Sequence, residues 1–323
     1  MTKRISIIGC GNIGSRHLQA ISKLKQSLII DVVEPDNNAK TLAKSRLKEM
    51  NPEMDNHKFN WYSNLNELDC ASDLVIIATT SNGRANLIKT LLEKGHSRFL
   101  VEKIVCQSHI EYQELLSNMH SFNAKGWVNT PRRYFKSYQK IIHYLSDSNF
   151  YNLSVIAGNE GLGSNAIHFI DIFSWLTNDY QLKLTGEFLK DQLLTNKRGD
   201  KFLEFVGTIT GTAKNGSLLT ITFLPSDNMP LTVDLSGDDK RIIINETNQT
   251  ILHTSNIKDI DLDFHTEYQS NISLDVANDI LINDDCLLPS LENSFHTHSE
   301  LFRIFDLHVE KILKQKNILC PIT

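Results

Sequence analysis

Three glycines near the start of the chain have the spacing of a dinucleotide-binding turn. They lie in Gly9-Cys10-Gly11-Asn12-Ile13-Gly14, which follows a short apolar run and precedes a stretch with helical spacing. In such a turn the first glycine allows a tight bend, the second lets the backbone approach a pyrophosphate, and the third lets helix and strand pack closely. The N-terminus of the helix then stabilises the negative charge of the pyrophosphate. Because Glu34 stands 20 residues after Gly14, at the end of the next apolar run, these features together predict a dinucleotide site.

Glu34 also indicates which dinucleotide this turn binds. Its carboxylate can accept hydrogen bonds from the adenosine ribose, and its charge repels the 2′-phosphate of NADP. The nearest cation downstream is Lys40. We therefore expect NAD as the cofactor, with NADP as the alternative.

Two further places in the sequence carry polar side chains that could meet a substrate. Glu102 and Lys103 directly follow the apolar run Phe99-Leu100-Val101, and an open parallel sheet binds ligands beyond the carboxyl ends of its strands. His168 and Asp171 are three residues apart, so they share one face of a predicted helix. Taken alone, these residues favour a solvent-exposed lysine and a core histidine that is hydrogen-bonded to Asp171.

The first 105 residues alternate between strand and helix patterns. Apolar runs predict strands at 5–8, 28–33, 73–78 and 99–101, and helical spacing predicts helices at 13–25, 38–50 and 86–94. Strands this apolar, separated by helices, indicate a parallel sheet that is covered on both faces. The expected fold class is α/β, and residues 1–125 are expected to form a Rossmann domain with a doubly wound parallel sheet.

From about residue 150 the apolar pattern changes to a period of two. It predicts strands at 151–157, 182–189, 204–212, 217–224, 231–236 and 241–245. Asn215-Gly216 predicts a hairpin turn between two of them. Helices are expected at about 165–177 and 295–314, whereas 255–290 reads as irregular with a short helix. Residues 126–323 are therefore expected to form an α+β domain whose sheet is largely antiparallel.

The composition argues against several classes of protein. With 33 Lys and Arg against 38 Asp and Glu, and no strongly basic run, the chain is not expected to bind nucleic acid. No apolar run approaches the length of about 18 residues that a membrane span needs, and no signal peptide is recognisable. The five cysteines lie far apart, and His296 and His298 do not share a helix face, so no metal site is expected. We expect a cytoplasmic protein.

Several motifs follow one another in an order that is typical of a known family. They are the opening segment Ile5–Gly14, Thr79-Thr80-Ser81-Asn82 after the third strand, Glu102-Lys103 after the fourth, Val128–Arg133, and His168-Phe169-Ile170-Asp171. In this order they resemble the Gfo/Idh/MocA-type NAD(P)-dependent oxidoreductases, which act mostly on sugars and polyols. The likeness covers nearly the whole chain, including the antiparallel second domain.

The resemblance implies a role for each of these residues. The residues that would contact the cofactor are Gly9, Gly11, Asn12, Ile13, Gly14, Glu34, Thr79, Thr80, Asn82, Glu102 and Lys103. Lys103 would also contact the reacting hydroxyl, His168 would accept or donate its proton, and Asp171 would support His168. The residues that would bind the substrate are Arg133, Ser164 and Asn165.

Two positions depart from the family pattern. Ile104 stands where the Glu-Lys-Pro motif has proline, so we expect a less rigid loop after Lys103. Ser164 stands where many members carry an aspartate four residues before the histidine. Acid–base chemistry at the hydroxyl would therefore depend on His168 and Lys103 alone.

We predict an NAD(P)-dependent oxidoreductase that interconverts a hydroxyl and a ketone on a sugar or sugar derivative. Two alternatives remain open, namely a tightly bound NAD used transiently for elimination or glycosidic cleavage, and a non-catalytic NAD-binding sensor. We also place the apolar residues of the second sheet on both of its faces. With the family resemblance, this placement predicts a homodimer or homotetramer built through that sheet. The residues concerned are Phe205, Ile209, Leu219, Ile221 and Phe223.

Overall fold

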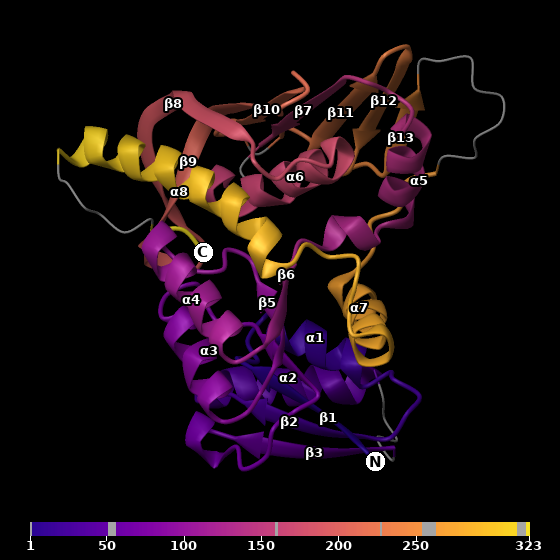
Figure 1. Cartoon of the computed structure of the whole chain (residues 1–323), viewed down its shortest axis with the longest axis vertical. Helices are drawn as coiled ribbons and strands as arrows, with labels where there is room; N and C mark the ends of the chain where they lie inside the picture. Colours follow the sequence, from indigo (N-terminus) through magenta and orange to yellow (C-terminus); the bar gives the residue numbers. More distant parts are fainter. Residues whose placement is uncertain (1, 51–55, 159–160, 227, 254–262, 315–320) are drawn as a thin grey trace. The chain divides into compact units, whose positions relative to one another are not determined.

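The chain folds into two units, each built on its own sheet, in the computed structural model (Figure 1). The structure describes residues 2–50, 56–158, 161–226, 228–253, 263–314 and 321–323. The first unit comprises Met1–Cys106, Ile110–Pro131 and Glu267–Leu291. The second comprises Gln107–His109, Arg132–Thr266 and Glu292–Thr323.

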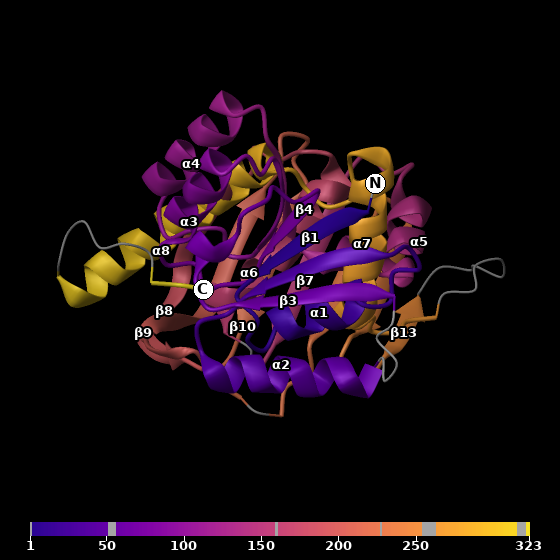
Figure 2. The same ribbon diagram turned by 90° about the horizontal axis from the view of Figure 1, so that it is seen from below.

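The first unit contains a parallel sheet of six strands in the order β3-β2-β1-β4-β5-β6. The strands are β1 (Lys3–Ile8), β2 (Leu28–Val33), β3 (His57–Tyr62), β4 (Leu74–Ile77), β5 (Arg98–Glu102) and β6 (Lys125–Asn129). Their helices are α1 (Gly14–Ile21), α2 (Asn37–Met50), α3 (Arg84–Glu93) and α4 (His109–Ser121). Figure 2 shows α1 and α2 on one side of the sheet and α3 and α4 on the other, which confirms the doubly wound arrangement.

The strand order reverses at β1. The chain first builds outward from β1 to β2 and β3, and then returns to build β4, β5 and β6 on the other side. In doubly wound sheets the helices on either side of this reversal diverge, so a crevice opens beyond the carboxyl ends of β1 and β4. The glycine turn, Glu34 and Lys103 all follow the carboxyl ends of strands in this sheet.

Three elements of the first unit, β3, α4 and α7, were not expected as the structure has them. β3 is an edge strand whose side chains are only half-buried, so its sequence lacks the apolar run that marks β1 or β4. The helix α7 (Gln269–Asn283) lies where an irregular segment with a short helix was expected, and residues 255–262 of that segment lie outside the described part. Ile272, Val276 and Ile280 recur every four residues on the buried side of α7, which packs against α1.

The second unit contains a sheet of seven strands in the order β13-β12-β11-β7-β10-β9-β8. The strands are β7 (Tyr151–Ala157), β8 (Lys183–Asn196), β9 (Gly199–Thr212), β10 (Leu218–Phe223), β11 (Thr232–Gly237), β12 (Lys240–Asn245) and β13 (Thr250–His253). All neighbours pair antiparallel except β7 and β10, so the expected, largely antiparallel sheet is confirmed. The strands β8 and β9 form a longer hairpin than the alternation of their sequence indicated.

Helices cover one face of this second sheet. Figure 1 shows α6 (Leu162–Thr177) lying along it, and α6 packs against β7, β9 and β10. The helix α8 (Leu291–Leu313) joins β9 through Phe205 and Phe305, whose rings stack with centroids 4.1 Å apart. None of the helices in the described part of the chain combines the length and the apolar composition that crossing a bilayer requires.

The apolar residues that we placed on both faces of this sheet lie on one face. Phe205, Ile209, Leu219, Ile221 and Phe223 are all buried. Ile209 pairs with Ile221, and the other three residues are an even number of positions from one of these two, so all five point to the face that α6 covers. The opposite face is rich in threonine and serine and includes the exposed side chains of Ile156, Leu218 and Leu252.

The two faces can be distinguished by substitution. Ile221→Asp places an unpaired charge at a position that is 0 % exposed, and we expect it to lower the free energy of unfolding by about 3 kcal/mol or more. Leu218→Asp, three residues earlier on the opposite face, is at a position 45 % exposed in the single subunit and should change the free energy of unfolding of that subunit by less than about 1 kcal/mol. Urea denaturation of both variants measures the difference. Equal losses would contradict the assignment of faces.

Candidate cofactor site and active-site residues

The glycine turn between β1 and α1 has the geometry of a pyrophosphate site. Gly9 has a φ of +82°, and a Cβ there would lie 3.0 Å from the backbone nitrogen of Thr79. A Cβ on Gly14 would lie 2.0 Å from the carbonyl oxygen of Gly9, so only glycine lets α1 begin this close to the turn. A Cβ on Gly11 would meet no atom within 4 Å. Gly9 and Gly14 are thus required by the fold, whereas Gly11 leaves open space for a ligand.

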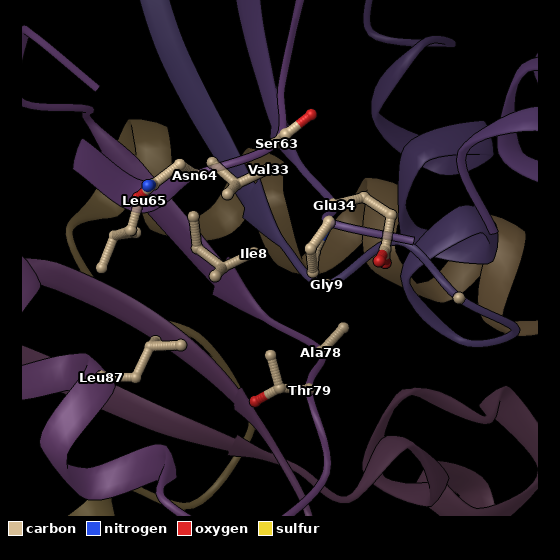
Figure 3. Close-up of a pocket in the computed structure, with 12 residues that line it drawn as sticks. Ile8, Gly9, Val33, Glu34, Ser63, Asn64, Leu65, Ala78, Thr79 and Leu87 are labelled. Carbon is tan, nitrogen blue, oxygen red and sulfur yellow. The ribbon is translucent and has the colours of Figure 1, made fainter. Parts of the chain in front are cut away.

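A cavity of about 470 Å³ opens beside this turn (Figure 3). One part of its wall is apolar, with Ile8, Val33 and Leu87 in Figure 3, and its polar groups include the carboxylate of Glu34. Its lining comes from the ends of β1, β2 and β4, from α3, and from the segment after β3: Ile8, Gly9, Gly11, Val33, Glu34, Pro35, Ser63, Asn64, Leu65, Ala78, Thr79 and Leu87. An apolar wall with a few polar groups is the usual lining of a small-molecule site, and it suits the adenosine half of a dinucleotide.

Glu34 is held at the rim of this cavity by two backbone amides. Its Oε2 accepts a hydrogen bond from the amide of Cys10 at 2.6 Å, and its Oε1 accepts one from the amide of Asp36 at 2.9 Å. Burial raises the pKa of the Cys10 thiol to about 12, and the charge of Glu34 contributes to the rise, so the thiol stays neutral beside the turn. Lys40 donates a hydrogen bond of 2.9 Å to the hydroxyl of Ser63, which lines the same cavity.

The other predicted cofactor residues lie at the edges of the site. Asn12 is exposed, and its carbonyl accepts a hydrogen bond of 3.1 Å from Arg46, which ties the turn to α2. Ile13 is the residue before α1. Of the residues after β4, Thr79 lines the cavity, whereas Thr80 and Asn82 are exposed in the following loop.

Glu102 belongs to a buried network that the sequence did not indicate. Its Oε1 lies 3.0 Å from Nε2 of His17 and accepts a hydrogen bond from the amide of Asn129. The other ring nitrogen of His17 lies 2.8 Å from the hydroxyl of Ser273 in α7. Burial alone would raise the pKa of Glu102, but His17, Asn129 and the charge of Lys103 outweigh burial and lower it, so this carboxyl is ionised.

Lys103 follows Glu102 at the end of β5 and is only 9 % exposed. Ile104, which replaces the proline of the family motif, is fully buried. The guanidinium of Arg84 donates hydrogen bonds to the backbone carbonyls of Glu102, Ile104 and Thr79. The loop after Lys103 therefore has a restraint that the sequence-based expectation of lower rigidity did not include.

In the second unit, Arg133 and Asp171 form a buried ion pair. The guanidinium donates to both carboxylate oxygens of Asp171, at 2.8 and 2.7 Å, and to the hydroxyl of Tyr180 at 3.0 Å. Burial would lower the pKa of Arg133, but Asp171 outweighs this effect and raises it. Two residues that were predicted separately, one for the substrate and one to support His168, thus meet in one contact. His168 itself is buried near the middle of α6.

The first turn of α6 carries a carboxylate that the sequence analysis missed. Glu204 of β9 accepts hydrogen bonds from the backbone amide of Ser164, at 3.1 Å, and from the Ser164 hydroxyl. Asn196 donates to the same carboxylate at 2.6 Å and to Ser164 at 2.9 Å. A negative charge at this place is favoured by the N-terminus of α6. Although Ser164 stands where many members of the similar family carry an aspartate, Glu204 of β9 supplies a carboxylate at this place.

Glycine makes room for this carboxylate. Gly161 has a φ of +81°, and a Cβ there would lie 2.4 Å from Cδ of Glu204. Asn165, the third predicted substrate residue, donates a hydrogen bond of 3.1 Å to the carbonyl of Gly161.

Among the residues that the structure describes, no three His, Cys, Asp or Glu side chains lie close enough together to bind a metal ion.

Comparison with known proteins identifies the nucleotide-binding part of the chain. Residues 3–130 match the model of a family described as an oxidoreductase family with an NAD-binding Rossmann fold. Residues 3–130 therefore form a nucleotide-binding domain of the Gfo/Idh/MocA oxidoreductase type. The match confirms the expected family, and with it the expectation of an NAD-binding oxidoreductase. No curated protein sequence is significantly similar to the chain.

Solved structures share the fold along nearly the whole chain. A UDP-N-acetylglucosamine 3-dehydrogenase from Acidithiobacillus ferrooxidans is 14 % identical, with a TM-score of 0.71 over 97 % of this chain and 99 % of that one. A scyllo-inositol dehydrogenase from Lactobacillus casei, with bound NAD(H) and scyllo-inositol, is 15 % identical, with a TM-score of 0.66 over 99 % of each chain. A biliverdin reductase from Synechocystis, in complex with biliverdin and NADP+, is 13 % identical, with a TM-score of 0.66 over 95 % of this chain and 98 % of that one.

The glycine turn allows folding and binding to be separated. Gly11→Ala should leave the free energy of unfolding unchanged, because its Cβ meets open space, but should weaken NAD binding roughly tenfold or more by occupying the place of the pyrophosphate. Gly14→Ala should instead destabilise the fold, because its Cβ collides with the Gly9 carbonyl. Calorimetric NAD titration and thermal denaturation of both variants test this contrast. Unweakened NAD binding by Gly11→Ala would place the pyrophosphate elsewhere.

The preference for NAD should depend on Glu34. We expect Glu34→Ala to strengthen NADP binding roughly tenfold, because it removes the charge that opposes a 2′-phosphate. Lys40 is hydrogen-bonded to Ser63 at the rim of the cavity and should then attract the 2′-phosphate. The double variant Glu34→Ala/Lys40→Ala should therefore bind NADP more weakly than Glu34→Ala does. Lys44 lies one turn further along α2, over the ring of Trp61, and Glu34→Ala/Lys44→Ala is the matched control. Tighter binding of NADP than NAD by the parent protein would contradict this role of Glu34.

Proposed function

We propose that this protein is an NAD-dependent dehydrogenase or reductase that interconverts a hydroxyl and a ketone on a sugar or sugar derivative. The observation that carries the proposal is the cavity beside the glycine turn, with Glu34 fixed at its rim and Lys103 beyond the next strands of the same sheet. Two of the similar structures are a nucleotide-sugar dehydrogenase and an inositol dehydrogenase, which supports a polyhydroxylated substrate. The biliverdin reductase shows that the fold also serves other substrates, so the site residues must carry the argument.

The chemistry divides between two side chains. Bound NAD supplies the acceptor for a hydride from the carbon that bears the hydroxyl. We assign to His168 the removal of the hydroxyl proton, because an imidazole titrates near neutral pH and can act as a general base. We assign to Lys103 the stabilisation of the negative charge that develops on the same oxygen.

Neighbouring carboxylates support these two residues. Glu102 is ionised and buried next to Lys103, so it favours the ammonium form of the lysine. The Arg133–Asp171 pair ties α6 to the segment Pro131–Tyr134 and so fixes the helix that carries His168. Glu204 fixes the first turn of the same helix.

A screen of sugars and nucleotide sugars with NAD, read by NADH absorbance, tests the reaction class. The proposal expects net NADH formation with at least one polyol or sugar. A product that forms without net NADH would indicate transient use of the cofactor in an elimination or glycosidic cleavage. Binding of NAD without turnover across the panel would indicate a sensor.

The two assigned residues should act together. Lys103→Ala and His168→Ala should each lower turnover roughly 10²-fold or more, and the double variant should resemble the worse single one because both act on one oxygen. NAD affinity should change much less in His168→Ala. Lys89→Ala, at an exposed position of α3, is the control and should retain the parent rate. A rate for His168→Ala within a few-fold of the parent would mean that the base is another residue.

We also propose that the protein forms a homodimer or homotetramer through the uncovered face of the second sheet. The support is the set of exposed apolar side chains on that face, Ile156, Leu218 and Leu252, at 43 %, 45 % and 61 % exposure. Leu218→Asp places a charge among them without touching the core. Light scattering should show an oligomer for the parent and a smaller species for Leu218→Asp. A monomeric parent at micromolar concentration would remove the proposal.

A further inference from the structure

Arg84 is a fully buried cation that none of the roles above uses. It is the first residue of α3, follows Gly83 in the left-handed conformation, and is 1 % exposed. The N-terminus of a helix disfavours positive charge, and a buried cation is costly unless it is hydrogen-bonded. A guanidinium at this place therefore needs strong acceptors around it.

Backbone carbonyls supply these acceptors. One terminal nitrogen of Arg84 donates to the carbonyls of both Glu102 and Ile104, and the other donates to the carbonyl of Thr79. Thr79 follows β4 and lines the cofactor cavity, whereas Glu102 ends β5. A single side chain thus joins the wall of the cavity to the loop that carries Lys103.

The two carbonyls in this loop belong to the residues on either side of Lys103. The peptide group before Lys103 and the residue after it are therefore both anchored to the same guanidinium. The side chain of Glu102 is anchored separately by His17 and Asn129. With the backbone fixed at both ends, only the side-chain torsions of Lys103 remain to place its ammonium group.

We propose that Arg84 is a positioning residue that fixes the backbone of Lys103, and that it supplies the rigidity which a proline after the lysine would otherwise give. Ile104 retains the freedom of φ that proline lacks, so its restraint has to come from a tertiary contact. Planar guanidinium groups suit this task, because their fixed donors can hold several oxygens in one arrangement. The effect of Arg84 on turnover rests on the proposed function, because that function assigns to Lys103 the stabilisation of the reacting oxygen.

The test compares Arg84→Lys and Arg84→Ala with Ile88→Ala. Ile88 is a fully buried residue one turn further along α3, so its truncation destabilises the same helix and removes none of the hydrogen bonds of Arg84. Two measurements are made without NAD or substrate. They are hydrogen–deuterium exchange of residues 102–106 and the acetylation rate of Lys103, both read by mass spectrometry.

We expect both Arg84 variants to exchange residues 102–106 roughly tenfold faster than the parent and to acetylate Lys103 several-fold faster, and Ile88→Ala to leave both rates near the parent values. Added guanidinium at millimolar concentration should slow both rates in Arg84→Ala and not in Ile88→Ala. If Arg84→Ala does not fold, Arg84→Lys, which keeps the charge but not the fixed donors, still decides the question. Parent-like rates in Arg84→Lys, or the same increase in Ile88→Ala, would overturn the proposal.

These results are separable from the proposed function. Faster exchange in the Arg84 variants together with unchanged turnover in Lys103→Ala would refute the reaction assigned to Lys103 and leave the positioning role of Arg84 intact. If Lys103→Ala does lower turnover, Arg84→Lys should lower the turnover number roughly tenfold while the NAD dissociation constant changes by no more than a few-fold.

Discussion

The close approach of α1 to β1 is the constraint on which the rest of the first unit depends. A side chain on Gly14 would occupy the position of the Gly9 carbonyl, so the helix can begin at this place only with glycine there. With α1 so placed, the turn leaves open space beside Gly11, and Glu34 accepts a hydrogen bond from the amide of Cys10 across the turn. The same placement brings His17 of α1 against Glu102, which precedes Lys103. The shape of the cofactor turn and the position of Lys103 thus both depend on glycine at position 14.

Both units fix their functional side chains through buried carboxylates that accept hydrogen bonds from distant parts of the chain. Arg133 bonds Asp171, Glu204 lies at the first turn of α6, and Glu102 contacts His17. Removing the donors of a buried carboxylate leaves a charge without hydrogen bonds, which is costly, so each of these contacts holds its element in one arrangement. Rigid placement is what a general base and an ammonium group need, because proton and hydride transfer tolerate little error in position.

The parts that could be predicted from the sequence are those determined by neighbouring residues. The turn from β1 to α1, the carboxylate at the end of β2 and the alternation of the second sheet depend on glycine conformation and on the period of apolar residues, which are local signals. The buried pairs are not local. His17 and Ser273 are 256 residues apart, and Ser164 and Glu204 are 40 apart, so only the folded chain brings them together. The placement of the five apolar residues on both faces of the second sheet was wrong for a related reason, since a period of two gives the alternation within one strand but not the register between two strands.

Transfer of a labelled hydrogen tests the central claim most directly. The protein would be incubated with NAD and a panel of sugars that carry deuterium at every carbon-bound position, and the cofactor would be recovered and weighed by mass spectrometry. Direct hydride transfer predicts NADH that is heavier by one deuterium with at least one sugar. Unlabelled NAD recovered beside a chemically altered sugar, or an unaltered panel in the presence of bound NAD, would contradict the account.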